Sequence, residues 1–403
     1  MPGCAGRCPR GLTNVPGCAG RCPRGLTTEL LDLNKLTNRK YFIGVDEAGY
    51  GPNLGPLVIA GSLWSAPADC TEQLFTQAFQ SHFATAPWSA DCQHVPLGDS
   101  KKLYSSRGGL ATLEAGLLAM LHLLPAAGAE KHDVAEVAKT FGGSTPSAET
   151  LGEFHYGRLG DAIDRLVSPE LVDELGKLAW YANYAEQPIP VALEAGAVQR
   201  LSRIARTALA TCDIELVDLR AAVICEPHFN RVVAQTGSKG ELLSRATLDV
   251  VVRLLDACSV VSSTKSSATT SAVPSFAATE VYCDRQGGRK NYLPILMAAL
   301  PERWFAETQV SAQRSSYHSA AEQPLTVHFS VGGDSFPPTA LASMLAKYLR
   351  ERLMGRLNDY WKRLKPDLQP TAGYPLDARR FRAQIEPLAQ REQLPAEQWW
   401  RCK

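Results

Sequence analysis

The segment Tyr41–Pro56 constrains the fold of this chain more than any other part of its sequence. Its first five residues, Tyr41–Val45, are apolar, aromatic or β-branched apart from one glycine, which is the pattern of a buried strand. Asp46 and Glu47 follow directly, and a stretch rich in glycine and proline then leads into a second apolar run, Leu57–Ala60. Two strands joined by such a turn predict a hairpin that opens an α/β domain.

Hydrophobic periodicity predicts the remaining elements of the core. Apolar residues recur at helical spacing in three long segments, over residues 106–124, 239–256 and 339–364. Apolar and β-branched runs predict further strands over residues 213–217, 221–224, 279–283 and 325–329. Strands interleaved with helices indicate an α/β fold, with a mixed β-sheet flanked by helices.

The chain has 403 residues, which allows two or three domains, or one core with a large insertion. Residues 127–212 are rich in acidic side chains, and we interpret them as a helical insertion that faces solvent. The Ser/Thr/Ala-rich segment 259–278 predicts a flexible loop. The predicted divisions are a disordered tail over 1–39, a core in two parts over 40–126 and 213–380, the insertion between them, and a C-terminal extension over 381–403.

The first 39 residues contain a tandem repeat. Residues Pro2–Thr13 recur unchanged as Pro16–Thr27, so that two Cys-x-x-x-Cys pairs follow each other. Four cysteine thiolates could hold a zinc ion, but no apolar face accompanies the repeat, and a disordered tail is the favoured interpretation. The odd total of eleven cysteines, without a secretory signal, favours reduced thiols. Because no apolar run is long enough for a membrane span, we expect a soluble cytoplasmic protein without membrane contact.

The charge of the chain is distributed unevenly. The net charge is only +1, so a nucleic-acid partner would need a local basic patch. Residues 344–403 contain 13 Lys and Arg against seven Asp and Glu. Several of these cations fall on the helix predicted over 339–364, and we therefore expect a basic surface there.

Carboxylates occur at the ends of three predicted strands. Asp46 and Glu47 end the first strand, Asp284 ends a later one, and Asp334 follows a third. Each alone is more often a helix cap or a residue of a solvated turn. Together, without basic partners, they would repel one another unless a divalent cation neutralised them. A set of ligands that are all oxygen atoms suits Mg²⁺ or Mn²⁺. Two such ions can stabilise both the attacking and the leaving oxygen when water attacks a phosphodiester.

Four blocks of sequence resemble the ribonuclease HII family and occur in its order. Asp46-Glu-Ala-Gly-Tyr-Gly-Pro-Asn-Leu-Gly-Pro56 matches its opening motif at every fixed position but one, where Tyr50 replaces an arginine. Asp99-Ser-Lys-Lys-Leu103 repeats a second motif, and Asp334 with Ala342-Ser-Met-Leu-Ala-Lys347 resembles a third. Gly373-Tyr374 corresponds to a Gly-Tyr near that family's C-terminal end. The resemblance covers roughly residues 40–110 and 215–380.

The resemblance implies an RNase H-like fold and an endoribonuclease that hydrolyses the RNA strand of RNA–DNA hybrids with two metal ions. The implied partners are RNA–DNA hybrids or duplexes that contain ribonucleotides, and no protein partner is implied. The implied catalytic and metal-binding residues, with Mg²⁺ or Mn²⁺ as cofactor, are Asp46, Glu47, Asp284 and Asp334. The implied nucleic-acid contacts are Gly49, Tyr50, Gly51, Ser100, Lys101, Lys102, Lys347 and Tyr374.

A second hypothesis is a nucleic-acid-binding protein that keeps the RNase H-like fold but has lost catalysis. Tyr50 cannot offer the charged donor of an arginine, and Asp284 is followed by Arg285 where that family has glycine. The insertion is a further departure from the family. A P-loop nucleotide hydrolase is excluded because the chain has no Gly-x-x-x-x-Gly-Lys-Ser/Thr segment.

Overall fold

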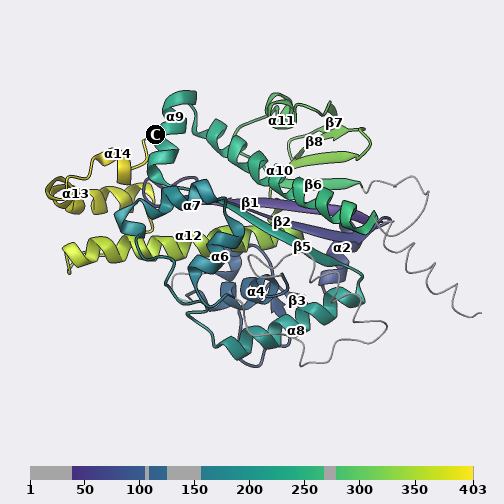
Figure 1. Ribbon diagram of the computed structural model, residues 1–403, viewed down its shortest axis with the longest axis horizontal. Helices are drawn as coiled ribbons and strands as arrows, with labels where there is room; N and C mark the ends of the chain where they lie inside the picture. Colours follow the sequence, from purple (N-terminus) through teal and green to yellow (C-terminus); the bar gives the residue numbers. More distant parts are fainter. Residues whose placement is uncertain (1–38, 105–108, 125–155, 267–277, 403) are drawn as a thin grey trace, which may run out of the picture.

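The computed structural model describes residues 39–104, 109–124, 156–266 and 278–402, with the backbone alone for residues 259–266 and Asp334. A central sheet is covered by helices on both faces (Figure 1). The long helix α12 (Pro337–Leu364) packs on one face, and α10 (Lys239–Ser266) packs on the other. The predicted tail, except for Arg39, and the whole segment 125–155 lie outside the described residues.

Seven strands form the central sheet. In their order across it they are β5 (Glu215–Ile224), β2 (Leu57–Pro67), β1 (Arg39–Ala48), β6 (Thr279–Asp284), β9 (Leu325–Ser330), β8 (Arg314–Ser319) and β7 (Ala306–Val310). The pairs β1–β6 and β6–β9 are parallel, and the other neighbouring pairs are antiparallel, including the predicted β1–β2 hairpin. The predicted fold class, a mixed β-sheet flanked by helices, is therefore confirmed. The parallel strands β1, β6 and β9 end at the same edge of the sheet.

Alternate residues of β2 face two separate cores. Val58 and Ala60 belong to the core beneath α12, whereas Leu57 and Ile59 belong to the core beneath α10. Side chains of a strand point alternately to opposite faces, so a strand buried on both sides must be apolar throughout. This is why polar residues do not alternate with apolar ones in Leu57–Ala60.

The start of α12 lies directly on β1. Pro337 and Pro338 occupy the first turn of the helix, where a missing N–H costs no hydrogen bond. Gly44 in β1 permits the contact, because a Cβ there would lie 2.2 Å from the backbone of Pro338 and Thr339. The close approach brings the first turns of α12 beside the end of β1.

Short elements connect β2 to the later strands. They are α2 (Glu72–Phe79), β3 (Phe83–Ala84), β4 (Val95–Pro96), α3 (Ser100–Leu103) and α4 (Ala111–Leu121). The helix predicted over 106–124 corresponds to α4, which is shorter at both ends within the described residues. β3 and β4 form a separate two-stranded parallel sheet.

The described part of the predicted insertion is helical but does not face solvent as expected. It contains α6 (Leu159–Leu166), α7 (Pro169–Gly176), the 3₁₀-helix η2 (Ala179–Tyr181) and α8 (Ala195–Thr211). Tyr156, Trp180 and Tyr181 are almost fully buried in the core beneath α12. The prediction failed because the acidic composition of the segment hid apolar residues that gather on one side of each helix.

Several element boundaries also differ from the prediction. A single strand, β5, replaces the two strands predicted over 213–217 and 221–224. α10 continues to Ser266, so the segment 259–266 is helix where a flexible loop was predicted. Between β6 and β9, where the sequence pattern predicted a loop without regular elements, the chain forms α11 (Leu293–Ala299) and the β7–β8 hairpin.

The C-terminal region is also helical. It contains α13 (Pro375–Arg391), which runs across the predicted boundary at residue 380, and α14 (Ala396–Trp399). A further helix, α9 (Glu226–Thr236), precedes α10. Within the described ranges, none of the helices combines the length and the apolar character needed to cross a membrane.

Candidate functional site at the shared edge of three parallel strands

The four predicted carboxylate positions lie at one edge of the sheet. β1 pairs with β6 so that Val45 is opposite Cys283, which places Asp46 and Asp284 next to each other at the strand ends. β6 pairs with β9 so that Asp284 is opposite Ser330. Asp334 follows shortly after, in the 3₁₀-helix η3 (Gly333–Ser335), and its side chain is outside the described part of the structure.

Asp46 and Glu47 are buried acids in a repulsive environment. Burial raises the pKa of Asp46 to about 7, and the charge of Asp284 adds to the increase. Burial raises the pKa of Glu47 to about 8, with further contributions from the charges of Asp46 and Asp284. Lys101 acts in the opposite direction on both groups. The charge of Asp284 is therefore close enough to Asp46 and Glu47 to destabilise their charged forms.

The donor chemistry of this cluster fits a hard divalent cation. The candidate donors are all carboxylate oxygens, and within the described residues Asp46, Glu47 and Asp284 form no ion pair with Lys or Arg. The described side chains nevertheless include no group of three Asp, Glu, His or Cys residues arranged to hold a metal ion. The described side chains therefore place oxygen donors near one another, but they do not by themselves complete the coordination of a metal ion.

A chain of hydroxyl groups orients Asp46. Its carboxylate accepts a hydrogen bond from the Ser343 hydroxyl, on α12, and another from the backbone N–H of Glu47, at 2.8 Å. The Oγ atoms of Ser343 and Ser100 are 2.9 Å apart. Ser100, predicted as a phosphate contact, is 5% exposed, so its hydroxyl lies inside the protein behind Asp46.

Lys101 and Lys102 are exposed on α3, next to this cluster. Asp99 caps the helix by accepting a hydrogen bond from the backbone N–H of Lys101, at 2.9 Å. Lys102 lines a hollow of about 210 Å³ together with Asp99 and Ser335, the residue after Asp334. Both lysines therefore lie on the side of the sheet edge where the carboxylates are.

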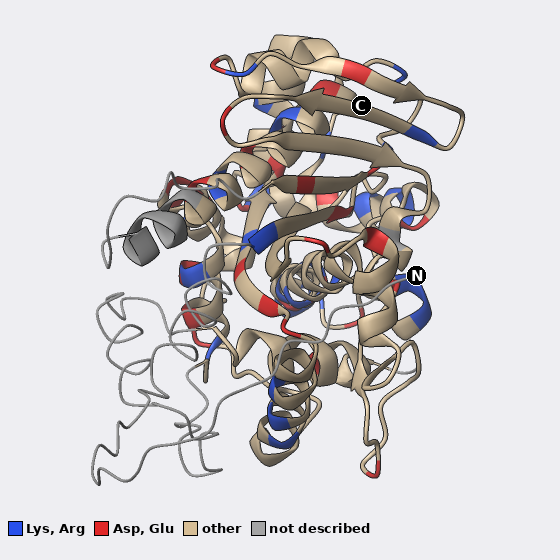
Figure 2. Ribbon diagram, turned by 90° about the vertical axis from the view of Figure 1, so that its right-hand side faces the viewer, with Lys and Arg blue, Asp and Glu red and all other residues tan. Residues whose placement is uncertain are grey.

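The basic surface predicted on α12 is partly internal. Arg350 and Arg352 are 1% and 7% exposed. Arg352 donates to the backbone oxygen of Pro188 and to the side-chain oxygen of Gln187, each at 3.1 Å. Figure 2 shows Lys and Arg residues on several elements, interspersed with Asp and Glu. The prediction was wrong for Arg350 and Arg352, because they donate to carbonyl groups of neighbouring segments, whereas Lys362 and Arg363 are exposed as expected.

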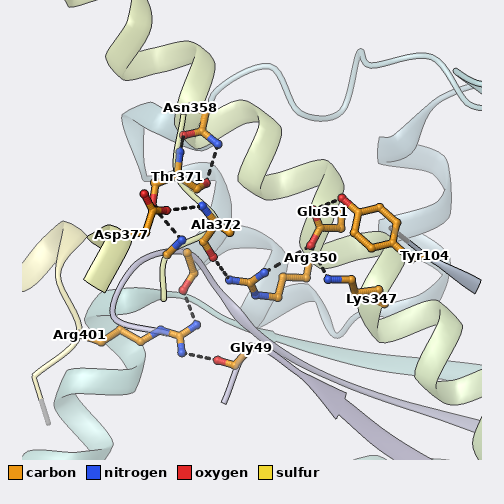
Figure 3. Close-up of polar contacts among 12 residues, drawn as sticks. Gly49, Tyr104, Lys347, Arg350, Glu351, Asn358, Thr371, Ala372, Asp377 and Arg401 are labelled. Atoms are coloured by element: carbon orange, nitrogen blue, oxygen red, sulfur yellow. Dashed lines mark hydrogen bonds and ion pairs between the residues drawn. The ribbon is translucent and has the colours of Figure 1, made fainter. Parts of the chain in front are cut away.

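Lys347 also has partners inside the protein. Its Nζ lies 2.7 Å from Oε1 of Glu351 and 4.5 Å from the ring centroid of Tyr104 (Figure 3). The Tyr104 hydroxyl donates to the other carboxylate oxygen of Glu351 at 2.9 Å. Lys347 is consequently held by an acid and an aromatic ring, with its side chain 19% exposed.

The loop after Glu47 is fixed by two buried arginines (Figure 3). Gly49 has a φ of +90°, and a Cβ there would lie 2.4 Å from Nε of Arg350. Arg401, near the C-terminal end of the described chain, donates to the backbone oxygens of Gly49, at 2.6 Å, and Gly55. Arg350 lies within a block that resembles ribonuclease HII, but no sequence pattern pointed to Arg401.

A second segment supports the same loop. The backbone oxygen of Gly373 accepts a hydrogen bond from the N–H of Asn53 at 2.8 Å. Arg350 donates to the backbone oxygen of Ala372 at 2.9 Å, and Asp377 accepts from the N–H of Ala372 (Figure 3). Next in the chain, Tyr374 is 51% exposed, with the Arg350 guanidinium carbon 5.9 Å from its ring centroid.

The remaining predicted contacts, Tyr50 and Gly51, are at the outer side of the loop. Burial raises the pKa of Tyr50, and the charge of Glu47 adds to the increase, which places the phenol near the carboxylates. Nζ of Lys239 lies 5.0 Å from the centroid of the Tyr50 ring. A Cβ added at Gly51 would meet no atom within 4 Å.

Comparisons with known proteins give only distant similarities. No protein-family model and no curated protein sequence matches the chain. A chain in the PCNA:RNase HII complex from Archaeoglobus fulgidus is 13% identical, with a TM-score of 0.34, over 90% of this chain and 94% of that one. The ribonuclease H2 from Pyrococcus horikoshii is 14% identical, with a TM-score of 0.34, over 89% and 92%.

A third similar structure is Bst-RNase HIII in complex with Mn²⁺. It is 14% identical, with a TM-score of 0.32, over 92% of this chain and 68% of that one. Identities and TM-scores in this range assign neither a family nor an activity to the chain.

Proposed function

We propose that this protein is an endoribonuclease that hydrolyses the RNA strand of RNA–DNA hybrids or of ribonucleotide-containing duplexes. The observation that carries the proposal is the gathering of Asp46, Glu47 and Asp284 at adjacent strand ends, where burial and the charge of Asp284 raise the pKa of both Asp46 and Glu47. Perturbed acids in such a cluster are typical of functional sites. The sequence resemblance to ribonuclease HII supports the same activity.

Mg²⁺ or Mn²⁺ would be held by Asp46, Glu47, Asp284 and Asp334. The bound ions would stabilise the charge that develops on the phosphodiester and increase the acidity of the attacking water. The ionised carboxylates needed for this are disfavoured in the protein alone, so binding of the cation and loss of their protons are coupled.

The chain's own residues would position the substrate. Lys101 and Lys102, exposed beside the carboxylates, would contact backbone phosphates. Ser343 and Ser100 hold Asp46 in one orientation. The loop Gly49–Gly51 would place its backbone against the ribose, since distinguishing RNA from DNA requires contact with the 2′-hydroxyl. Tyr374, exposed next to Arg350, would stack on a sugar of the same strand.

Cleavage of a labelled RNA–DNA hybrid, in Mg²⁺ and in Mn²⁺, tests the proposal. We expect the wild-type protein to cut the RNA strand and to leave a DNA duplex of the same sequence intact. Asp46→Asn should lower kcat by at least about a hundredfold, because a metal-binding carboxylate is lost. Asp69→Asn, at an exposed position after β2, should retain wild-type activity. Undiminished cleavage by Asp46→Asn would refute the assignment of the site.

A second candidate is a hybrid-binding protein without catalysis. The observation in its favour is that the described side chains include no group of three arranged for a metal ion. This protein would bind the hybrid with an affinity unaffected by Asp46→Asn and would cleave it in neither metal. Tight binding combined with cleavage in Mn²⁺ would eliminate this candidate.

A further inference from the structure

Tyr50 and Lys239 form a pair that joins the loop to α10. Tyr50 replaces the arginine expected in the opening motif, and Lys239 is the first residue of α10. The Lys239 ammonium lies 5.0 Å from the centroid of the Tyr50 ring, within the range of a cation–π contact. The two residues are far apart in the sequence, so the pair exists only because α10 begins beside the loop.

The Lys239 ammonium has no acidic partner among the described residues. Arg289, whose charge lowers the pKa of Tyr50, already has an acidic partner. Its Nη2 lies 3.0 Å from Oε2 of Glu241. Lys239 is therefore a cation beside the loop that is not neutralised within the protein. A surface cation fixed by an aromatic ring keeps its three N–H donors for a further partner.

The position of the pair suits a phosphate contact. Tyr50 is close enough to Glu47 to respond to its charge, so the pair borders the carboxylate cluster. A Cβ added at Gly51, the next residue, would meet no protein atom within 4 Å. A strand whose ribose lies against Gly49–Gly51 would carry a phosphate past the Tyr50 ring, where the ammonium lies.

We infer that Lys239, seated on the ring of Tyr50, supplies the cationic contact to the phosphodiester backbone that the loop itself lacks. This inference rests on the proposed function, because it assumes that an RNA–DNA hybrid binds at the carboxylate edge. The tyrosine fixes the ammonium, and the lysine provides the charge, so two residues perform the role of one arginine.

The charge of Lys239 can be tested separately from its packing. Tyr50 also packs against the apolar core beneath α10, so its place does not depend on the ammonium alone. Lys239→Ala and Lys239→Gln should therefore leave the loop packed against the helix. Lys177→Ala is the matched control, because Lys177 is an exposed lysine on α7, outside the loop and the carboxylate edge.

The experiment measures KM and kcat for hybrid cleavage, and hybrid affinity as a function of salt concentration. We expect Lys239→Ala and Lys239→Gln to raise KM by roughly fivefold to tenfold with kcat nearly unchanged. The slope of log affinity against log salt should fall by about 1, as for one lost phosphate contact. Tyr50→Arg in the Lys239→Ala background should restore KM and the slope, because it returns a cation to the same place.

Three outcomes decide the inference. It is overturned if Lys239→Ala matches Lys177→Ala in KM and salt slope while wild-type protein cleaves the hybrid, and the proposed function then stands. It is also overturned if Tyr50→Arg restores neither KM nor the salt slope. The defect of Lys239→Ala would then come from lost packing of the loop and not from a lost charge. A wild-type protein that neither binds nor cleaves the hybrid refutes the proposed function and this inference together.

Discussion

Asp46 and Glu47 place two carboxyl groups in a desolvated, repulsive environment at one strand end, at the expense of stability. Both carboxyl groups are buried, and Asp284 adds a third charge from the neighbouring strand. Only hydroxyl and backbone N–H groups, together with the charge of Lys101, favour their ionised forms. A protein optimised for stability alone would place amides or apolar residues here, so the cluster indicates selection for function.

The raised pKa of Glu47 predicts a pH-dependent effect of removing its charge. The pKa rises from an ordinary value of 4.5 to about 8, so the folded state binds the proton more tightly than the unfolded state. Wild-type stability should therefore fall as pH rises between these values. With a metal chelator present, the free energy of unfolding of Glu47→Gln should equal that of the wild type below pH 4.5. It should exceed that of the wild type above a pH of about 8.

Urea denaturation at pH 5 and pH 9 would measure this difference. Glu302→Gln, at a side chain that is 64% exposed, should show the same stability change at both pH values. A Glu47→Gln variant that loses stability with rising pH as the wild type does would show that Glu47 is not the titrating group.

At the scale of elements, the Gly49–Gly55 loop depends on segments that follow it by hundreds of residues. Arg401 is fully buried and donates to backbone oxygens at both ends of the loop. Glu226, at the start of α9, accepts from the N–H of Gly55 at 3.0 Å. Burial raises the pKa of Glu226, and the charge of Arg401 opposes that increase. The buried acid and base thus hold the loop while compensating one another.

Arg401→Lys should weaken this arrangement without removing the positive charge. A lysine has one nitrogen in place of the guanidinium fork and cannot reach the backbone oxygens of both Gly49 and Gly55. Leaving buried carbonyl groups without donors should lower the free energy of unfolding by roughly 2–4 kcal/mol. Chemical denaturation measures the loss, and hydrogen exchange should show faster opening of the loop amides.

Arg391→Lys is the control for this substitution, because Arg391 is exposed at the end of α13. It should change stability by less than about 0.5 kcal/mol. Equal stability of the two variants would mean that Arg401 does not hold the loop.

At the scale of the whole molecule, the segment 156–212 is part of the main core. Trp180 in η2 is 1% exposed, and its ring centroid lies 6.3 Å from that of Tyr360 on α12. Glu114 on α4 accepts hydrogen bonds from the N–H groups of Val191 and Ala192. These contacts tie the segment to the same helices that cover the sheet, so it should unfold together with them.

Trp180→Ala tests this coupling. Removing a buried tryptophan should lower the free energy of global unfolding by roughly 3–5 kcal/mol, in a single transition. Val191→Ala lies in the same segment, but its side chain is 49% exposed, so it should cost less than about 0.5 kcal/mol. A Trp180→Ala variant with an early, separate transition and an unchanged main one would show that the segment is an independent unit.

The sequence alone determined the elements that depend on local pattern. The β1–β2 hairpin, the strand that became β6 and the long helix α12 follow from short-range hydrophobic spacing. The sequence also showed that carboxylates follow three predicted strands, whereas the parallel pairing that brings these strand ends to one edge is seen only in the structure. The roles assigned to the individual site residues remain predictions.

Only the tertiary structure decided which charged residues are internal and which remain available. Arg350 and Arg401 look like surface cations in the sequence, yet Arg401 donates to carbonyl groups of the loop and Arg350 to that of Ala372, in the segment that supports the loop. Lys239 has no sequence neighbour that would place it on Tyr50. The physical reason is that the partners of a buried or stacked cation come from distant segments, and those contacts depend on strand register and helix packing, which no local periodicity encodes.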